Sequence, residues 1–553
     1  MADTHTRNLC AEIIRSQFGP LTAKLCSVLL TRGRLSFSHL VRFSGLKPRT
    51  ARACILVLVQ QNLLWHTKGD EEGEMFEINT DECLMRLRFG KFVWLADQMF
   101  GEQGAEIIQI ILDHGKLRPP EIFSLLSIYD PKKTKQYRQI LHKLVAGSYL
   151  KVSTVLSHLS PRDKWIQYEA EEKRKITGFP TAKELREAKE LARARLKREE
   201  EEAEQIGLKR KAKNQQAGSY SNKARVNTSS TDKTDFQHNA YRESCRKTRM
   251  SVNYERFAVH LRNMVVERAV REKFNRPASL VLRAALEVTE TPQSSVDDIR
   301  SAPTSVASIA MHISEDANLS SGLVYASKKI SDMTCIKDYL GMLSSADNPT
   351  PEGRAMSFVS YSSSKVQVEF EIIKRRLREN VLESVARDKH GQEGVRILRL
   401  LAKTGKMDEK QISKIVMMAP KDVRPLLVAL SADSLISTQE VPKSADRNPA
   451  RTFYLWYVDH HKAFQVILGG VYKTLYNILA RRRAEREHGD IAAVLEKRAR
   501  SDVSQDEGLL TRVERETLED WEAKETKLTV LEIRVEELVF LLKDLGSLPA
   551  DSE

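Results

Sequence analysis

The stretch GRLSFSHLVRFSGLKPRTARACILVLVQQNLL, residues 33–64, recurs 372 residues later without a gap as GKMDEKQISKIVMMAPKDVRPLLVALSADSLI, residues 405–436. Most paired positions hold apolar residues or helix-ending and helix-starting residues. The pairs are Gly33 and Gly405, Leu35 and Met407, Leu40 and Ile412, Phe43 and Ile415, Leu46 and Met418, Pro48 and Pro420, Arg52 and Arg424, Ile55 and Leu427, and Leu58 and Leu430. Because the shared positions are those of a core, the pattern predicts a repeat of fold.

The first copy contains the elements of a small helical domain. Apolar residues at helical spacing between Leu21 and Thr31 predict a helix that ends at Gly33. Ser36 suits the N-cap of a second helix, and Pro48 suits the first turn of a third. LLWHT and MFEIN then predict two strands joined by the polar loop GDEEGE. Three helices followed by a two-stranded hairpin are the element order of a winged helix-turn-helix.

Two further segments show the same order more weakly. In residues 104–153, Gly115-Lys116-Leu117 corresponds to the glycine turn of the first copy, and Tyr149-Leu150 corresponds to Leu63-Leu64. Residues 241–370 contain predicted helices at Tyr254–Glu272 and Ala278–Glu287, then the strands SFVSYS and KVQVEFE. We therefore predict a mainly α fold with small β wings, built from four tandem winged helices at residues 1–85, 86–175, 241–370 and 371–460.

Residues 176–240 separate the second and third predicted domains. Residues 181–204 have strong helix propensity and almost no apolar stripe, which predicts a solvated helix. The polar sequence after Gly207 has no periodicity, and we expect it to be disordered.

Residues 461–545 predict a coiled-coil helical hairpin whose turn is the polar segment 501–508, followed by a tail at 546–553. The apolar positions of the first arm are Phe464, Leu468, Val471, Leu475 and Ile478. Those of the second arm begin with Trp521 and continue through the predicted seam Leu528, Leu531, Val535, Leu538, Leu542 and Leu545. A partner helix seated on these leucines is the alternative to an internal seam.

Charge and composition restrict the class of partner. Of the 553 residues, 89 are Lys or Arg and 75 are Asp or Glu, so the formal net charge is +14. This excess favours nucleic acid, an acidic protein face or a membrane surface. The six cysteines form no CxxC pair, which excludes a disulfide scaffold and a Cys/His zinc finger. No apolar run reaches the length of a membrane span and the first residues lack an apolar signal core, so we expect a soluble protein that is not secreted.

The sequence contains no recognisable catalytic motif. P-loop, GxGxxG, HExxH and GxSxG patterns are absent, and the 13 histidines are scattered. We therefore predict a binding protein that uses no metal and no cofactor.

The predicted recognition helices and one wing carry the candidate contacts to DNA. The second helix of a helix-turn-helix enters the major groove in many DNA-binding proteins. The basic residues at these positions are Lys47, Arg49 and Arg52 in the first domain, and Lys421, Arg424, Lys443, Arg447 and Arg451 in the fourth. Such cations bind phosphates without a base code, and no Asn or Gln stands among them to read adenine. Winged helices also dock proteins, so backbone contact, base reading and protein docking all stay open.

A second basic run lies in the linker. Lys209, Arg210, Lys211 and Lys213 have the composition of a nuclear localisation signal. A solvated run of charges is the alternative.

The ordered set of domains resembles one family. LCAEIIRSQFGPLTAKLCSVLLTRGRLSFSHLVRFSGL, PTAKELREAKELARARLKREEEE, NYERFAVHLRN and LEIRVEELVFLLKDL are similar to the winged-helix subunit of the RNA polymerase III peripheral heterotrimer. That family is in turn similar to the large subunit of general transcription factor IIE. The resemblance covers nearly the whole chain, apart from residues 207–240 and the Ser-rich part of the third domain.

The resemblance implies a nuclear, non-catalytic subunit. Its partners would be two companion subunits of the heterotrimer and the clamp of the largest polymerase subunit. Its role would be to recruit the polymerase to promoters and to open DNA, without sequence-specific reading, for the synthesis of transfer RNAs and 5S ribosomal RNA. A free winged-helix DNA-binding regulator is the alternative that the residues alone leave open.

Overall fold

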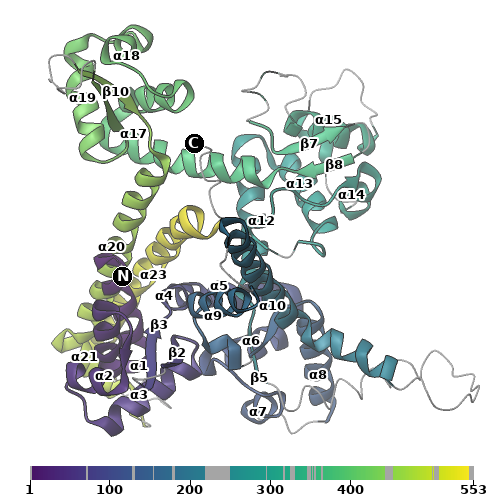
Figure 1. The fold of residues 1–553 in the computed structure, drawn as a ribbon, viewed down its shortest axis with the longest axis vertical. Coiled ribbons are helices and arrows are strands. Elements are labelled where there is room, and N and C mark those ends of the chain that lie inside the picture. The colour runs from purple at the N-terminus through teal and green to yellow at the C-terminus, as the bar shows by residue number, and fades with distance from the viewer. Residues whose placement is uncertain are drawn as a thin grey trace, which may run out of the picture. The chain divides into compact units, whose positions relative to one another are not determined.

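The computed structural model describes residues 3–69, 73–126, 131–153, 155–176, 181–217, 249–293, 295–314, 318–323, 331–344, 350, 353, 356–362, 365–442, 452–500, 502–503 and 510–546. The chain divides into two compact units, Met1–Phe257 and Ala258–Glu553. Helices predominate in both, and the β-sheets are small (Figure 1).

The first unit begins with the predicted helices and wing. The elements are α1 (Thr4–Arg32), β1 (Leu35–Ser36), α2 (Phe37–Ser44), α3 (Pro48–Gln60), β2 (Leu64–Gly69) and β3 (Gly73–Ile78). The strands form one sheet in the order β1-β3-β2. Ser36 is the N-cap of α2 and Pro48 lies in the first turn of α3, so these two predictions are confirmed. Helix α1 starts earlier than the apolar period indicates and contains a non-helical residue at Gly19.

The next segment of the same unit corresponds to the predicted second domain, and we call it and the segments of the third and fourth predicted domains the second, third and fourth repeats. Before it lie α4 (Thr80–Met85), a 3-10 turn (Arg86–Arg88) and α5 (Phe89–Phe100). The repeat itself contains α6 (Glu102–His114), α7 (Pro119–Leu125), α8 (Pro131–Ala146) and β4 (Leu150–Ser153). A 3-10 turn (Val155–His158), α9 (Pro161–Arg174), α10 (Ala182–Ala217) and β5 (Arg249–Val252) complete the unit.

The second wing is formed differently from the sequence prediction. Strand β4 pairs antiparallel with β5, with Leu150 opposite Val252 and Ser153 opposite Arg249. The sequence pattern places residues 249–252 in the third domain and predicts that the segment 176–240 links the second and third domains. That segment instead lies between the two strands of one wing. Four-residue strands carry too little periodicity for a sequence to indicate their partner, particularly across such a distance.

Helix α10 also differs from the prediction, since it continues to Ala217 and includes residues after Gly207 that were expected to be disordered. It packs against α9 and contacts β4. Residues 218–240 lie outside the described part of the chain.

The third repeat opens the second compact unit. Its elements are α12 (Tyr254–Lys273), α13 (Arg276–Val288), β6 (Thr304–Ser305), α14 (Val306–His312), a 3-10 turn (Leu319–Gly322), α15 (Asp332–Ser344), β7 (Val359–Ser362) and β8 (Lys365–Val368). The sheet order is β6-β8-β7, and α13, α14 and α15 gather on it around one apolar core (Figure 1). Both predicted helices and both predicted strands are confirmed.

The fourth repeat contains α17 (Phe370–Thr404), α18 (Glu409–Val416), α19 (Pro420–Ala432), β9 (Ser437–Pro442) and β10 (Thr452–Tyr457). The two strands pair antiparallel, from Ser437 opposite Tyr457 to Pro442 opposite Thr452. Helix α17 is interrupted at Gly391, where φ is 68°.

Backbone conformation confirms the repeat of fold between residues 33–64 and 405–436. Gly33 and Gly405 have φ of 81° and 79°, and Gly45 and Met417 have φ of 63° and 58°. Asn62 and Ser434, also 372 residues apart, have φ of 60° and 58° in the turn before the wing. One pair departs from the expected core, because Phe43 is 37% exposed and Ile415 is 54% exposed.

The C-terminal region is helical, with α20 (His460–Glu487), α21 (Gly489–Arg498), α23 (Arg512–Val539) and a π-helical turn (Phe540–Asp544). Helix α20 packs against α23. Phe464, Val471, Leu475 and Ile478 of the first arm are buried as predicted.

The inward face of α23 is rotated from the predicted seam over much of its length. Leu542 and Leu545 lie beyond the end of α23 and are buried, whereas Leu531 is 45% exposed and Leu528, Val535 and Leu538 are only partly buried. Glu525 and Glu532 face α20 instead, and both pair with Arg482, at 2.7 Å and 2.8 Å. Two stripes one residue apart differ by about 100° around a helix. The ion pairs with α20 select the stripe that the apolar residues alone did not indicate.

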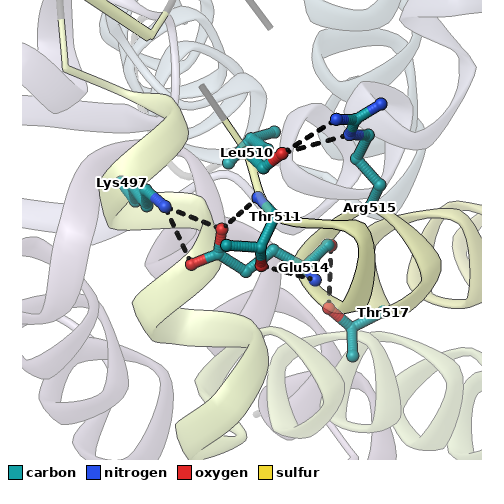
Figure 2. Close-up of polar contacts among 6 residues, drawn as sticks. All are labelled: Lys497, Leu510, Thr511, Glu514, Arg515 and Thr517. Atoms are coloured by element: carbon teal, nitrogen blue, oxygen red, sulfur yellow. Dashed lines mark hydrogen bonds and ion pairs between the residues drawn. The ribbon is translucent and has the colours of Figure 1, made fainter. Parts of the chain in front are cut away.

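The start of α23 is tied to α21 by charge (Figure 2). Lys497 Nζ lies 3.0 Å and 2.7 Å from the two carboxylate oxygens of Glu514. The same carboxylate accepts the Thr511 backbone N–H at 2.8 Å, which forms a capping box. These donors lower the pKa of Glu514 to about 2, with the Lys497 hydrogen bond as the largest cause.

Candidate nucleic-acid interface

The first turns of α3 form an exposed basic helix end. Lys47 is the N-cap, and Lys47, Arg49 and Arg52 are all exposed. The helix contains no acidic residue, so nothing within it neutralises these cations. Its partly positive N-terminus adds to the same field. Arg52 lies 5.3 Å above the ring of Phe37, which leaves the guanidinium at the surface.

The C-terminal end of α3 is occupied by the second repeat. Gln60 Nε2 donates to the carbonyls of His114 at 3.0 Å and Lys116 at 2.7 Å. Gln61 Nε2 donates to the carbonyl of Asp113 at 2.6 Å. A Cβ at Gly115 would lie 2.4 Å from the Gln60 carbonyl oxygen, so the two repeats approach through a glycine. The last residues of α3 are therefore closed to a large ligand, whereas Lys47, Arg49 and Arg52 at the other end are exposed.

The wing of the first repeat is also in contact with the second. The ring of His66 on β2 stacks on that of His158, with centroids 5.7 Å apart. Arg34 pairs with Asp163 of α9 at 2.7 Å and donates to Thr67 of β2. A wing held in this way is less free to follow a DNA groove than the first turns of α3.

A buried lysine lies beneath this contact. Lys116 is 3% exposed and its Nζ lies 2.7 Å from the Val59 carbonyl oxygen and 3.0 Å from His158 Nε2. Burial lowers the pKa of Lys116 to about 8, and the nearby Arg249 adds to the shift. Burial, together with the charge of Lys116, lowers the pKa of His158 to about 4. Both groups belong to the joint between repeats and not to a surface for ligands.

The corresponding helix of the fourth repeat is less basic. Lys421 and Arg424 of α19 are exposed, but Arg424 pairs with Glu409 of α18 at 2.9 Å. Asp422 lies in the same first turn. Lys443, Arg447 and Arg451 of the wing lie outside the described residues. The structure therefore distinguishes two helices that the sequence presented as equivalent.

The recognition helices also carry an outward apolar position that the sequence analysis missed. Leu56 of α3 is 69% exposed and Val428 of α19 is 58% exposed, and the two are 372 residues apart. Each stands seven residues after an exposed cation, Arg49 or Lys421, on one helix face. That spacing was visible in the repeat and could have indicated the face.

The remaining basic run lies on α10, whose backbone includes Lys209, Arg210, Lys211 and Lys213. Within the described ranges, no group of three or more His, Cys, Asp or Glu residues has the arrangement of a metal site. None of the described helices combines the length and apolar character needed to cross a membrane.

Comparison with known proteins gives one consistent result. Family descriptions match residues 8–66 as an RNA polymerase III subunit RPC82 helix-turn-helix domain and residues 139–359 as RNA polymerase III subunit RPC82. A third matches residues 382–458 as the POLR3C C-terminal winged-helix domain.

Two curated relatives are similar over nearly their whole length, and a third over a shorter segment. DNA-directed RNA polymerase III subunit rpc3 of Aspergillus clavatus is 24% identical, covering 98% of this chain and 100% of the relative. Subunit RPC3 of Bos taurus is 23% identical, covering 97% of each chain. Subunit rpc3 of Ajellomyces capsulatus is 38% identical over 32% of this chain and 27% of the relative. Family matches at the start, in the middle and in the fourth repeat, together with relatives similar over nearly the whole chain, support a winged-helix subunit of RNA polymerase III.

Proposed function

We propose that this chain supports promoter recruitment, DNA opening and transcription initiation as a non-catalytic peripheral subunit of DNA-directed RNA polymerase III. The products would be small RNAs such as transfer RNAs and 5S ribosomal RNA. End-to-end similarity to relatives named as RNA polymerase III subunits carries this proposal. The proposed partners are two companion subunits and the clamp of the largest subunit, in the nucleus.

The architecture we propose is four tandem winged helices followed by a coiled-coil hairpin. In every repeat, a residue two positions before the start of a helix bridges to a wing strand. The bridges are Leu35 to Phe76, Leu117 to Met250, Thr304 to Val366 and Met407 to Trp456. A shared bridge of this kind supports one common fold for all four repeats, with residues 249–252 counted in the second.

The proposed contact to promoter DNA is the first half of α3. Lys47, Arg49 and Arg52 are exposed on a helix without acidic residues, and phosphates need only such charges. Lys421 of the fourth repeat is a secondary candidate because Arg424 is already paired. The apolar Leu56 on the same face offers no hydrogen bond to a base edge.

Salt dependence of duplex binding tests this contact. Replacing Lys47, Arg49 and Arg52 with Ala should reduce the slope of log K against log salt by about 0.9 for each lost phosphate contact. A control variant with Arg186, Lys189 and Arg193 of α10 replaced removes the same charge from another exposed helix. An equal decrease in both variants would show a general effect of net charge and would reject α3 as the contact.

Affinity purification of the tagged chain from nuclei tests the assembly. Recovery of the largest polymerase subunits with two small companions is the expected outcome. Recovery of the chain alone, or with chromatin only, would favour a free winged-helix DNA-binding regulator.

A further inference from the structure

The end of the hairpin does not project as a free tail. After α23 the chain continues through the π-helical turn to Gly546, and we call residues 540–546 the strap. Phe540, Leu542 and Leu545 of the strap are 3%, 7% and 0% exposed. Leu542 lies in the apolar core of the fourth repeat, together with Leu382 and Phe464.

A buried arginine holds the carbonyl end of the strap. Arg378 of α17 is 2% exposed, and its Nε donates to the Leu541 carbonyl at 3.0 Å. Its Nη2 donates to the Gly546 carbonyl. The last carbonyls of a helix are partly negative and lack partners within the helix, so a guanidinium satisfies them well. The strap therefore supplies two backbone carbonyl acceptors to the buried guanidinium of Arg378.

The other side of the strap lies against the third repeat. A Cβ added to Gly546 would lie 2.6 Å from Asp297 Oδ1 and 2.8 Å from Lys374 Nζ. Lys374 itself donates to the carbonyls of Val296 and Asp298 in the loop before β6. Gly546 has a φ of 93°, a conformation that suits glycine. The strap therefore ends on the loop of the third repeat with no space for a side chain.

Helix α17 explains why this position matters. Its first residues, Phe370 and Ile373, belong to the core of the third repeat. From Leu382 onward its buried residues belong to the core of the fourth. Lys374 and Arg378 lie between the two sets, at the point where one helix passes from one core to the other. A single helix can bend there, and the strap provides a second connection across the same point.

We infer that the strap holds the third and fourth repeats together as one rigid body, and that Arg378 is the residue that binds the strap. A further contact from the preceding turn of α23 supports this role, because Glu537 pairs with Arg268 of α12 at 3.1 Å. Residues 540–546 then act as a conformational clamp.

Distances between spin labels in the full chain test the inference. Met311 of the third repeat is 82% exposed and Met417 of the fourth is 91% exposed, so both suit replacement with labelled Cys. Five native cysteines are buried, and Cys245→Ser removes the sixth. With the native strap, the distribution of label distances should be narrow. Arg378→Met should broaden it at least about twofold.

The matched control is Arg534→Met, an exposed arginine on α23, which should leave the distribution narrow. If Arg378→Met does not fold by circular dichroism, Gly546→Ala tests the same seat while retaining the guanidinium, and should also broaden the distribution. A folded Arg378→Met or Gly546→Ala chain with an unchanged narrow distribution would overturn the inference. A distribution that is already broad with the native strap would overturn it as well.

Discussion

Individual glycines decide how closely the repeats approach. Gly33 and Gly115 follow the first helix of the first and second repeats and have φ of 81° and 78°. No heavy atom lies within 4 Å of a Cβ built on Gly33, whereas a Cβ on Gly115 would lie 2.9 Å from Gln61 Cα. Both positions therefore require a positive φ, but only Gly115 also lacks space for a side chain.

Substituting each glycine with alanine separates the free-energy cost of a positive φ from the cost of the steric overlap. Gly33→Ala should cost only the positive-φ strain, about 1 kcal/mol. Gly115→Ala should cost about 2–4 kcal/mol because backbone of α3 must also shift. Urea unfolding of the full chain with each variant measures the difference. An equal loss of unfolding free energy in the two variants would show that the backbone at Gln60 moves away from residue 115 without strain.

His158 makes the first unit sensitive to acid. Its pKa is lowered to about 4, first by burial and then by Lys116, His66 and Arg249. The unfolded chain, with a histidine pKa near 6.5, binds a proton more readily than the folded chain. The free energy of unfolding should therefore fall as pH decreases from about 6.5 to about 4.

His158→Gln should flatten this dependence and recover about 1 kcal/mol at pH 5, after allowance for solvent screening. The measurement is the midpoint of urea unfolding at pH 7, 6 and 5. Unfolding is detected by the fluorescence of Trp65 or Trp94 in the first unit, with the other tryptophans replaced. His461→Gln, at an exposed position, is the control. An identical pH dependence in wild type and His158→Gln would contradict the assignment.

At the scale of elements, the buried face of α23 cannot be identified from its sequence alone, because two adjacent stripes of the helix could each face inward. Val539 is 3% exposed and Leu531 is 45% exposed, although the heptad pattern favours the stripe containing Leu531. On the first arm, by contrast, Phe464, Val471, Leu475 and Ile478 lie as their spacing indicates. The difference arises because α23 places Glu525 and Glu532 against Arg482.

Aspartate substitution tests the rotated face. Val539→Asp should destabilise the second unit by several kcal/mol, since it buries an unpaired carboxylate. Leu531→Asp should change the free energy of unfolding by about 0.5 kcal/mol or less. Thermal unfolding of the full chain compares them. A larger effect of Leu531→Asp would restore the seam predicted from the heptads, or indicate self-association through that face.

At the scale of the whole molecule, strand β5 shows that the second repeat is completed by residues far along the chain from its other strand. Residues 249–252 complete a wing that begins at residue 150. Met250 N–H and C=O also pair with Leu117, at 2.8 Å and 3.1 Å. The second repeat therefore cannot be complete before the chain has passed through α9 and α10.

Fragments test this dependence. A chain ending at residue 257 should unfold cooperatively, whereas a chain ending at 175 should lose protection from hydrogen exchange at Leu117 and β4. Adding residues 249–252 as a separate peptide should not restore protection, because a short strand gains little once it is untethered. Full protection of β4 in the shorter fragment would show that the wing forms without β5.

Local sequence signals are sufficient to predict the mainly helical fold class, the repeat and the position of most helices. Helix caps, glycine turns and apolar spacing are local signals, and Pro48, Gly33 and the period around Ile55 contain them within a few residues. Family resemblance extended this reading to function. The cations of α3 were also named from sequence, because charge on a recognition helix needs no partner to be noticed.

Long-range contacts, by contrast, set which strands pair, which helix face is buried and which charges are neutralised. They pair β4 with β5, rotate the face of α23, neutralise Arg424 with Glu409 and seat Gly546 on Lys374. Each outcome depends on residues that are distant in sequence and on contacts whose energies are individually small. A local pattern cannot indicate a partner far along the chain, and charge pairing is settled only when folding brings the partners together.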